Sequence, residues 1–432
     1  MAFGKWDHEV TSTINSIRGM HDILPSEMHL WHRLEEAVRD VFAAYGFEEI
    51  RIPVVEKTEL FARAIGGATD VVEKEMYTFK DRNGDLLSLR PEGTAGVVRA
   101  VIQNGLLYAA PFRLWYMGSM FRRERPQKGR TRQFHQVGAE VFGATGPDAD
   151  AELLALCQRL WQTIGLNDLR LEVNSLGTSE ERGRFRTDLH AFLSERKDQL
   201  DADSLRRLDR NPLRILDSKN PAVQQVLDDA PVLFEYLDQE SRDYFSGFCA
   251  LLDAFGIQYT INPRLVRGLD YYCHAVFEWI SDDLGAQGTV CAGGRYDGLV
   301  EIQGGRPWPG VGFAMGQERL VELMRAQSPP EPELPHVYLV MAGEAATESG
   351  LVLAERLRGQ LPQLRIQSNL GGGSFKSQFK RADRSGARLA LVLGEDEVSQ
   401  GRVTIKHLRD QSGQQQVGLD SLGAWLKEWL AD

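Results

Sequence analysis

Residues 122–140, "RRERPQKGRTRQFHQVGAE", place a cluster of cations between two apolar segments. The first eleven of these residues contain six cations and one acid, although the whole chain has a formal net charge of −11. The flanking segments "FRLWYMGSMFRRE" and "RQFHQVGAEVFG" predict two strands, which makes the cation-rich "RPQKGRT" the loop between them. Two strands would anchor this loop, so its cations could be aimed at a ligand.

The loop has a functional and a plain interpretation. Arg122 and Arg132 lie near the predicted strand ends, and arginine offers a planar fork that suits phosphate oxygens. Phe134 could add a stacking face for a base. These features fit a polyphosphate clamp, but charge alone favours a solvated basic loop.

The composition of the chain is that of a globular protein with two or three domains. It has 432 residues, of which 42% are hydrophobic and 26% charged. The negative net charge argues against sequence-blind nucleic-acid binding and leaves room for a local basic site. The four cysteines form no CxxC pair, which fits a reducing cytosol, and we expect neither a zinc site nor a disulfide framework. No apolar run approaches a membrane span, so no membrane partner is expected.

Changes in pattern along the chain predict its organisation. Residues 1–16 lack the pattern of a signal peptide and are expected to form a tail. Residues 17–325 are strand-rich, with a helical insertion at 180–255. A Pro-rich linker at 326–335 follows, and strands then alternate with helices over 336–432, which predicts a small α/β domain with a largely parallel sheet.

Three local patterns near the N-terminus carry definite predictions. After Pro25, apolar residues recur every four positions until Gly46, which predicts a helix with one buried stripe. "FEEIRIPVVE" predicts one strand, in which Pro53 favours an edge or a bulge. "MYTFKDRNGDLLSLR" predicts a hairpin with Asn83-Gly84 as its turn.

Other candidate sites are weak or ambiguous when taken singly. The glycine-rich stretches lack P-loop spacing, and His29 and His32 lack the HExxH pattern of a metal site. Arg267 lies in the apolar, strand-like "RLVRGLDYY"; it would meet either an anion or a structural acid. Cys273 and His274 are adjacent in a predicted strand and should point to opposite faces, which argues against a Cys-His nucleophile pair.

Taken together, the segments resemble the class II aminoacyl-tRNA synthetases, and specifically the histidyl-tRNA synthetase family. "FEEIRIPVVE" resembles the first class motif, used at the dimer interface, and "FRRE" with "RQFHQ" resembles the second. "GVGFAMGQERL" resembles the third motif, a strand leading into a helix with an arginine. "LVRGLDYY", "AGGRYDGL", "IRGMHDILP" and "LRPEGTAGVVRA" resemble signatures of the histidine family, and the resemblance runs from about Ile17 to the end.

The resemblance implies a fold and an activity. The fold would be α+β: a class II antiparallel sheet flanked by helices, a helical insertion and a C-terminal α/β anticodon-binding domain. The activity would convert L-histidine and ATP to histidyl-adenylate and pyrophosphate, and would then transfer histidine to tRNA(His). The protein would be a cytoplasmic homodimer, and Mg²⁺ would accompany the ATP. One alternative is a catalytically silent paralogue that acts as a regulatory subunit in histidine biosynthesis. A second is a ligase that transfers the activated amino acid to another acceptor.

The resemblance also implies roles for particular residues. Arg122 and Arg267 would act on the α-phosphate as the catalytic pair, and no protein-held metal is expected. ATP would be bound by Arg122, Arg130, Arg132, Phe134 and Arg319. Histidine would be bound by Glu92, Gly93, Thr94, Arg122, Gln136, Glu140, Arg267, Tyr271, Tyr272 and Tyr296. The chain departs from the family pattern at Cys273-His274-Ala275, where an arginine and a threonine are usual, and at Trp308.

Overall fold

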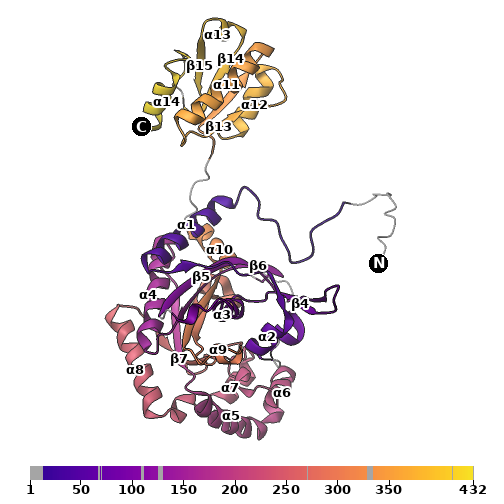
Figure 1. Cartoon of the computed structure of the whole chain (residues 1–432), viewed down its shortest axis with the longest axis vertical. Coiled ribbons are helices and arrows are strands. Elements are labelled where there is room, and N and C mark those ends of the chain that lie inside the picture. The colour runs from indigo at the N-terminus through magenta and orange to yellow at the C-terminus, as the bar shows by residue number, and fades with distance from the viewer. Residues whose placement is uncertain are drawn as a thin grey trace. The chain divides into compact units, whose positions relative to one another are not determined.

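The computed structural model describes residues 13–66, 69, 71–108, 111–124, 130–269, 271–327, 334–410 and 412–431. The chain divides into two compact units, Met1–Pro330 and Glu331–Asp432, which we describe separately (Figure 1). Most of the tail expected at 1–16, the centre of the linker expected at 326–335, and the loop residues Arg125 and Lys128 lie outside the described residues.

The first unit is built on a large sheet with strand order β1-β5-β6-β11-β10-β9-β7-β8. The pairs β1–β5 and β7–β8 are parallel, and the other neighbours are antiparallel. The strands are β1 (Glu48–Glu49), β5 (Phe112–Phe121), β6 (Gln133–Phe142), β7 (Arg170–Ser175), β8 (Thr260–Ile261), β9 (Cys273–Ile280), β10 (Thr289–Arg295) and β11 (Gly310–Gly316). The predicted strand–loop–strand is confirmed, because β5 and β6 pair from Phe112↔Phe142 to Phe121↔Gln133.

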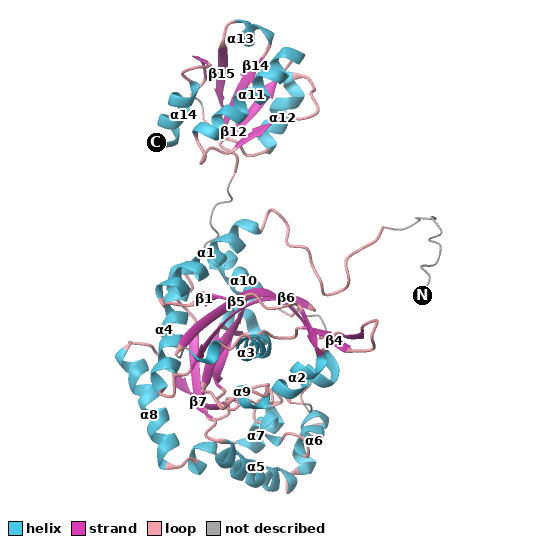
Figure 2. Cartoon of the chain, viewed as in Figure 1, coloured by secondary structure: helices cyan, strands magenta, loops and turns pink. Residues whose placement is uncertain are grey.

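Helices cover both faces of this sheet, as Figure 2 shows. On one face, α1 (Met28–Ala44), α4 (Pro147–Ile164), α8 (Gln239–Ala254) and α10 (Gln317–Gln327) share a core with Val137, Ala139 and Val141 of β6. On the other, α2 (Thr58–Ile65), α3 (Thr94–Gln103) and α9 (Leu299–Ile302) share a core with Leu114 and Tyr116 of β5. Successive side chains of a strand alternate between faces, so the sheet contributes side chains to both hydrophobic cores.

The first helix forms as its pattern predicts. Leu30, Leu34, Val38 and Phe42 recur every four residues and are all buried, which places one stripe of α1 against the sheet. Gly46 has φ 74°, a left-handed conformation that glycine adopts at little cost, and the helix ends just before it.

The single strand expected over "FEEIRIPVVE" is wrong. Its start forms β1, whereas its end forms β2 (Val55–Lys57) in a separate sheet of order β2-β4-β3. Pro53 has no N–H to donate to a ladder, and the carbonyl of Ile52 instead accepts from Arg90 Nη1 at 2.7 Å. The hairpin prediction is confirmed: β3 (Thr78–Lys80) and β4 (Leu86–Leu89) pair antiparallel, and Gly84 of the turn has φ 93°.

The inserted segment is helical, as expected. It contains α5 (Ser179–Ser194), α6 (Ala202–Leu208) and α7 (Pro221–Leu227) before α8. A capping box begins α5, because Thr178 Oγ1 accepts from Glu181 N and the Glu181 carboxylate accepts from Thr178 N. Helix α8 packs on α4 and belongs to the first core, so its charged sequence still supports the sheet.

The second unit is a smaller α/β sheet of order β13-β12-β14-β15-β16. Its strands are β12 (Val337–Met341), β13 (Ile366–Ser368), β14 (Leu389–Leu393), β15 (Arg402–His407) and β16 (Gln414–Gly418). Its helices are α11 (Glu344–Gln360), α12 (Phe375–Arg384), α13 (Glu395–Ser399) and α14 (Leu422–Ala431). The expected parallel pairing holds for β13-β12-β14, whereas β15 and β16 add an antiparallel edge. In the described part of the chain, none of the helices has the length and apolar character needed to cross a membrane.

Candidate active site

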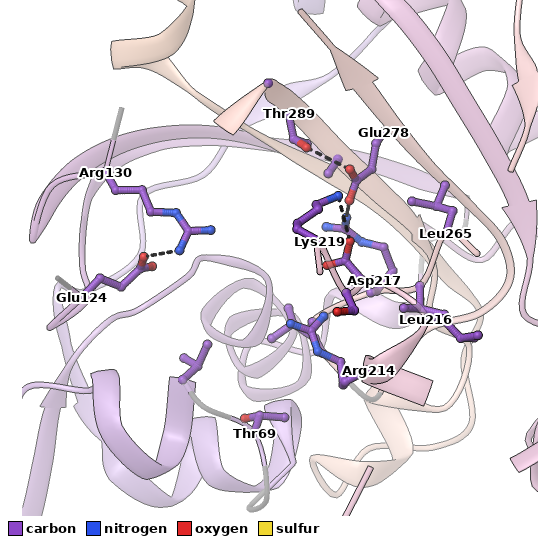
Figure 3. A pocket seen from close by; sticks show the side chains of 18 of the residues that line it. Thr69, Glu124, Arg130, Arg214, Leu216, Asp217, Lys219, Leu265, Glu278 and Thr289 are labelled. Atoms are coloured by element: carbon purple, nitrogen blue, oxygen red, sulfur yellow. Dashed lines mark hydrogen bonds and ion pairs between the residues drawn. The ribbon is translucent and has the colours of Figure 1, made fainter. Parts of the chain in front are cut away.

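The first unit contains a large groove between the sheet and the inserted helices, with a volume of about 1980 Å³. Figure 3 shows Glu124 and Arg130 on one side of it and Glu278 and Thr289 across the open space. Among the site residues expected from the sequence, those that line the groove are Glu92, Thr94, Arg122, Arg130, Phe134, Gln136, Arg267, Tyr271, Tyr272 and Arg319. Gly93, Arg132, Glu140 and Tyr296 do not line it.

Alternation along β6 decides which side chains reach the groove. Val137, Ala139 and Val141 face the helices of the first core, so the residues between them face the other way. Phe134 and Gln136 line the groove on that side. Among the described residues, Gln136 Oε1 is buried without a hydrogen-bond partner, which leaves it available to a ligand.

Arginines from the strand–loop–strand and from α10 converge in the groove. Arg122 Nε donates to the Pro91 carbonyl at 2.8 Å, and its guanidinium carbon lies 5.4 Å from the ring centroid of Phe134. Arg130 Nη1 donates to Glu124 Oε2 at 2.9 Å. Burial lowers the pKa of Arg319, and the positive charges of Arg130 and Arg122 lower it further. Such mutual repulsion indicates a site that is completed by an anion.

Arg132 takes a supporting position. Its Nε donates to the Glu124 carbonyl at 3.3 Å, while its own carbonyl accepts from Arg122 N at 2.9 Å. Arg132 therefore contacts the backbone beside Arg122, and its expected contact with ATP stays a prediction.

Arg267 enters the groove from a loop, and the strand-like conformation expected for "RLVRGLDYY" is wrong. No strand is assigned between β8 and β9 within the described residues there. Arg267 forms an ion pair with Glu278 of β9, and its guanidinium carbon lies 5.5 Å from the Tyr272 ring centroid. Glu278 also accepts from Thr289 Oγ1 at 2.9 Å. The interpretation as a partner of a structural acid is confirmed, and Arg267 also lines the groove; its contact with an anionic ligand stays a prediction.

Two buried carboxyl groups lie near each other: that of Glu92 lines the groove, and that of Glu140 is linked to the lining residue Thr94. Glu92 accepts from the backbone N–H groups of Thr94 at 2.7 Å and Ala95 at 3.0 Å, at the start of α3. Thr94 Oγ1 donates to Glu140 Oε1 at 2.7 Å, and the Tyr296 hydroxyl donates to Glu140 Oε2. Burial raises the pKa of both carboxyls, that of Glu140 to about 8, so Glu140 holds a proton near neutral pH.

Glu140 fits here because its neighbour on β11 is a glycine. Gly312 pairs with Glu140 across the β6–β11 ladder, and a Cβ on Gly312 would lie 1.8 Å from Glu140 Oε2. Any side chain at Gly312 would therefore displace the carboxyl.

Aromatic rings lie beside these carboxyls; Tyr271 and Tyr272 line the groove, and Tyr296 packs behind Tyr271. The ring centroids of Tyr271 and Tyr272 are 4.6 Å apart, and Tyr271 meets Tyr296 edge-on at 5.7 Å. Burial raises the pKa of all three phenols, so they remain neutral donors and acceptors. Each tyrosine offers an apolar ring face and a polar hydroxyl, and this combination suits a ligand with a flat polar ring.

Sequence reasoning missed residues that act on the predicted ones. Glu278 and Thr289 position Arg267, and the signal was present as a lone acid in the apolar segment "HAVFEWI". Glu318 accepts from His135 N at 2.9 Å and contacts His135 Nδ1 at 2.9 Å, which ties α10 to β6. That link joins residues far apart in sequence, and no local pattern predicts it.

The expectation that Cys273 and His274 point to opposite faces is wrong. His274 has φ 44°, and the register between β9 and β10 shifts at this point. A sulfur, a ring nitrogen and a carboxylate oxygen of Cys273, His274 and Asp297 lie within 4.8 Å of one another. Successive side chains do not alternate between the two faces here, because the strand contains a bulge.

The antiparallel sheet, the arginine-bearing β5–loop–β6 and the β11–α10 unit with Arg319 near the start of α10 are those of a class II aminoacyl-tRNA synthetase. Family models support a narrower assignment: that for histidyl-tRNA synthetase matches residues 19–320, and that for the anticodon binding domain matches residues 336–429. A histidine–tRNA ligase of Halorhodospira halophila (strain DSM 244 / SL1) is 59% identical over 415 residues, covering 96% of this chain and 98% of the relative. The chain belongs to the histidyl-tRNA synthetase family.

Solved structures agree with this assignment. The apo histidyl-tRNA synthetase of S. aureus matches with a TM-score of 0.79 at 34% identity, covering 96% of this chain and 100% of that one. A structure from Bacillus halodurans C, described as an ATP phosphoribosyltransferase regulatory subunit/histidyl-tRNA synthetase, matches with a TM-score of 0.65 at 22% identity, covering 89% and 99%. The second match shows the shared fold alone.

Proposed function

We propose that this chain activates L-histidine with ATP in the groove and then transfers the histidyl group to tRNA(His). Its family is one of aminoacyl-tRNA ligases, and the relative from Halorhodospira halophila is named as a histidine–tRNA ligase. The observation that carries the proposal is the convergence of Arg122, Arg267 and Arg319 on one groove that the buried Glu92 also lines.

In the first step, a carboxylate oxygen of histidine bonds to the α-phosphorus of ATP. The bond from that phosphorus to the β-phosphate oxygen breaks, and pyrophosphate leaves with the electron pair. Two anions have to approach each other, so fixed cations in a partly dry site favour the transition state. Arg122 and Arg267 take this role, because they come from β5 and from the opposite loop and line the same groove.

ATP is bound by the residues on the β5–β6 side. Phe134 offers its ring to the adenine, and Arg319 and Arg130 meet the phosphate tail. Arg132 acts by holding the loop on which Arg130 lies. The arginine repulsion that lowers the pKa of Arg319 is relieved when the phosphates enter.

Histidine is bound at the inner end of the groove. Glu92 receives the α-ammonium, with Gly93, Thr94 and Gln136 beside it, while Tyr271, Tyr272 and Tyr296 surround the ring. The pKa of Glu140 lies near neutrality, so its carboxyl can donate to or accept from one nitrogen of a neutral imidazole. The hydroxyl of Tyr272 can then meet the other nitrogen. A substrate without these nitrogens would leave buried polar groups unpaired, at about 1–3 kcal/mol per group.

The oxygen atoms of Glu278 and Thr289 are suited to Mg²⁺, a hard cation that prefers oxygen ligands and travels with ATP. Held there, the ion would neutralise charge on the phosphates.

The remaining partners concern the rest of the chain. The α12 region of the second unit presents Lys376, Lys380, Arg381 and Arg384, which suit RNA phosphates near the anticodon. A homodimer is supported by the resemblance of the segment around Pro53 to the class dimer motif, since Val54 and Val55 there are exposed. A cytoplasmic location fits this function.

The regulatory-subunit alternative makes a different prediction in a direct assay. We expect the full-length chain to exchange pyrophosphate into ATP only when histidine is present, and not with other amino acids. It should then charge tRNA(His) in preference to other tRNAs. Well-folded protein that binds histidine but shows no exchange would favour the regulatory alternative, and exchange without tRNA charging would favour transfer to another acceptor.

A further inference from the structure

The start of β9 contains a bulge that gathers three unusual side chains. Along the β9–β10 ladder, Gly294 pairs with Val276, but the next residue, Arg295, pairs with Cys273. His274 and Ala275 are therefore extra residues on β9, and His274 adopts φ 44°. A non-glycine residue in this region is strained unless its surroundings hold it.

The surroundings of the bulge do hold it in place. The His274 carbonyl accepts from Leu176 N at 2.7 Å, and His274 N donates to the Gly177 carbonyl at 2.9 Å. The His274 ring lies 5.0 Å from the Tyr244 ring of α8. Its position is therefore fixed by β7, by the turn after it and by α8.

Asp297 completes the cluster from the end of β10. Its N–H donates to Cys273 Sγ at 3.4 Å, and its Oδ1 accepts from Gly310 N and from Arg295 Nη1, both at 3.1 Å. One ligand atom from each of Cys273, His274 and Asp297 lies within 4.8 Å of the others. Among the described residues, His274 Nδ1 is buried without a hydrogen-bond partner, which leaves it available to a ligand.

We propose that Cys273, His274 and Asp297 bind a Zn²⁺ ion, with water at the remaining position. Thiolate, imidazole and carboxylate are the three ligand types that Zn²⁺ takes in proteins, at about 2.0–2.3 Å. Those bond lengths require the donors to draw closer together than they lie in this structure. Nearby Arg295 forms ion pairs with Asp150 and with Asp297 itself, so a carboxylate outside the cluster also compensates its charge.

A thiol nucleophile is the other chemistry such a cluster suggests, and the environment disfavours it. A carboxylate oxygen of Asp297 lies within 4.8 Å of the Cys273 sulfur, and a nearby negative charge disfavours the thiolate that a nucleophile needs. A bound Zn²⁺ ion would favour the thiolate by direct coordination.

The ion would join two strand ends that matter for the proposed function. Tyr272 directly precedes Cys273, and Tyr296 directly precedes Asp297. If the histidine site is as proposed above, the ion cross-links the backbone behind two of its walls. The metal site itself stands on the geometry alone and is tested without any measurement of activity.

The experiment uses the metal-free, full-length chain titrated with Co²⁺, whose complexes with thiolate absorb strongly. We expect one equivalent to produce a thiolate-to-cobalt charge-transfer band and Zn²⁺ to displace it. Cys273→Ser should abolish the band. His274→Asn, which keeps a residue that tolerates φ 44°, should weaken Co²⁺ binding at least tenfold.

Cys249→Ser is the matched control, because Cys249 is also half-buried and lies in α8; it should leave the band intact. Zn²⁺ should also raise the melting temperature of the wild-type chain and of Cys249→Ser, but not that of His274→Asn. Absence of the band in folded wild-type protein would overturn the proposal, as would an unchanged titration in His274→Asn.

Discussion

Arg267 and Glu278 form an ion pair that connects a loop to β9 in the wall of the groove. Their side chains are 16% and 17% exposed, so both charges are largely removed from water. A loop residue has no strand to orient it, and Glu278 supplies that orientation while Thr289 Oγ1 donates to its second oxygen at 2.9 Å. The orientation of the Arg267 side chain, the proposed catalytic group, therefore depends on Glu278, which the sequence motifs did not include.

Replacing Arg267 by alanine should remove most of the activation chemistry. We expect histidine-dependent ATP–pyrophosphate exchange to fall by about 10²–10³-fold, because a preorganised positive donor at the transition state is lost. ATP and histidine should still bind, since their other contacts remain. Arg39→Ala, at an exposed position of α1 paired with Glu35, is the control and should retain wild-type exchange. An Arg267→Ala variant with undiminished exchange would remove Arg267 from the mechanism.

A double-mutant cycle should show that Glu278 acts largely through Arg267. Glu278→Gln alone should reduce exchange, because Arg267 loses its orienting charge. Added to Arg267→Ala, the same change should have a smaller effect, so the two free-energy losses should not be additive. The four exchange rates measure the coupling directly. Additive losses would instead indicate that Glu278 acts separately, for example on a cation bound to ATP.

Replacing Glu140 by glutamine should weaken histidine binding and leave ATP binding almost unchanged. The amide cannot exchange a proton with the imidazole, and its single oxygen can keep only one of the hydrogen bonds that Thr94 and Tyr296 donate to the two carboxyl oxygens. We expect KM for histidine to rise by about tenfold or more, from the loss of one charged or strong hydrogen bond. Glu152→Gln, a partly exposed position paired with Arg113, serves as control. An unchanged KM for histidine would contradict the imidazole role.

Glu140 should also leave a signature in the pH dependence of stability. Its pKa is about 8 in the folded chain and ordinarily 4.5. Between these values the folded state holds a proton that the unfolded state has released, so the carboxyl's contribution to stability is lost as pH rises towards 8. The slope is at most about 1.4 kcal/mol per pH unit for one proton.

The measurement for this prediction is chemical unfolding from pH 5 to 8 in the wild-type chain and in Glu140→Gln. The free energy of unfolding of the wild type should decline relative to that of the variant across this interval. Parallel pH profiles for the two proteins would show that Glu140 is ionised in the folded state.

Local patterns in the sequence predicted the elements that need no distant partner to be recognised. The four-residue repeat of Leu30 to Phe42 predicted α1, Asn83-Gly84 predicted the β3–β4 hairpin, and the apolar segments around the basic loop predicted β5 and β6. The motif resemblance predicted the fold class and the family. It also named the residues of the site, whose individual roles stay predictions.

The sequence by itself determined the period of each segment, the cation cluster and the family motifs, because these depend only on neighbours along the chain. Tertiary structure alone decided that Arg267 meets Glu278, that Glu140 is buried beside Gly312, and that Cys273 and His274 converge at a bulge. Strand register sets the contact of Glu140 with Gly312 and the bulge at Cys273, and register is fixed by pairing between segments far apart in sequence. A shift of one residue there would move every side chain to the opposite face.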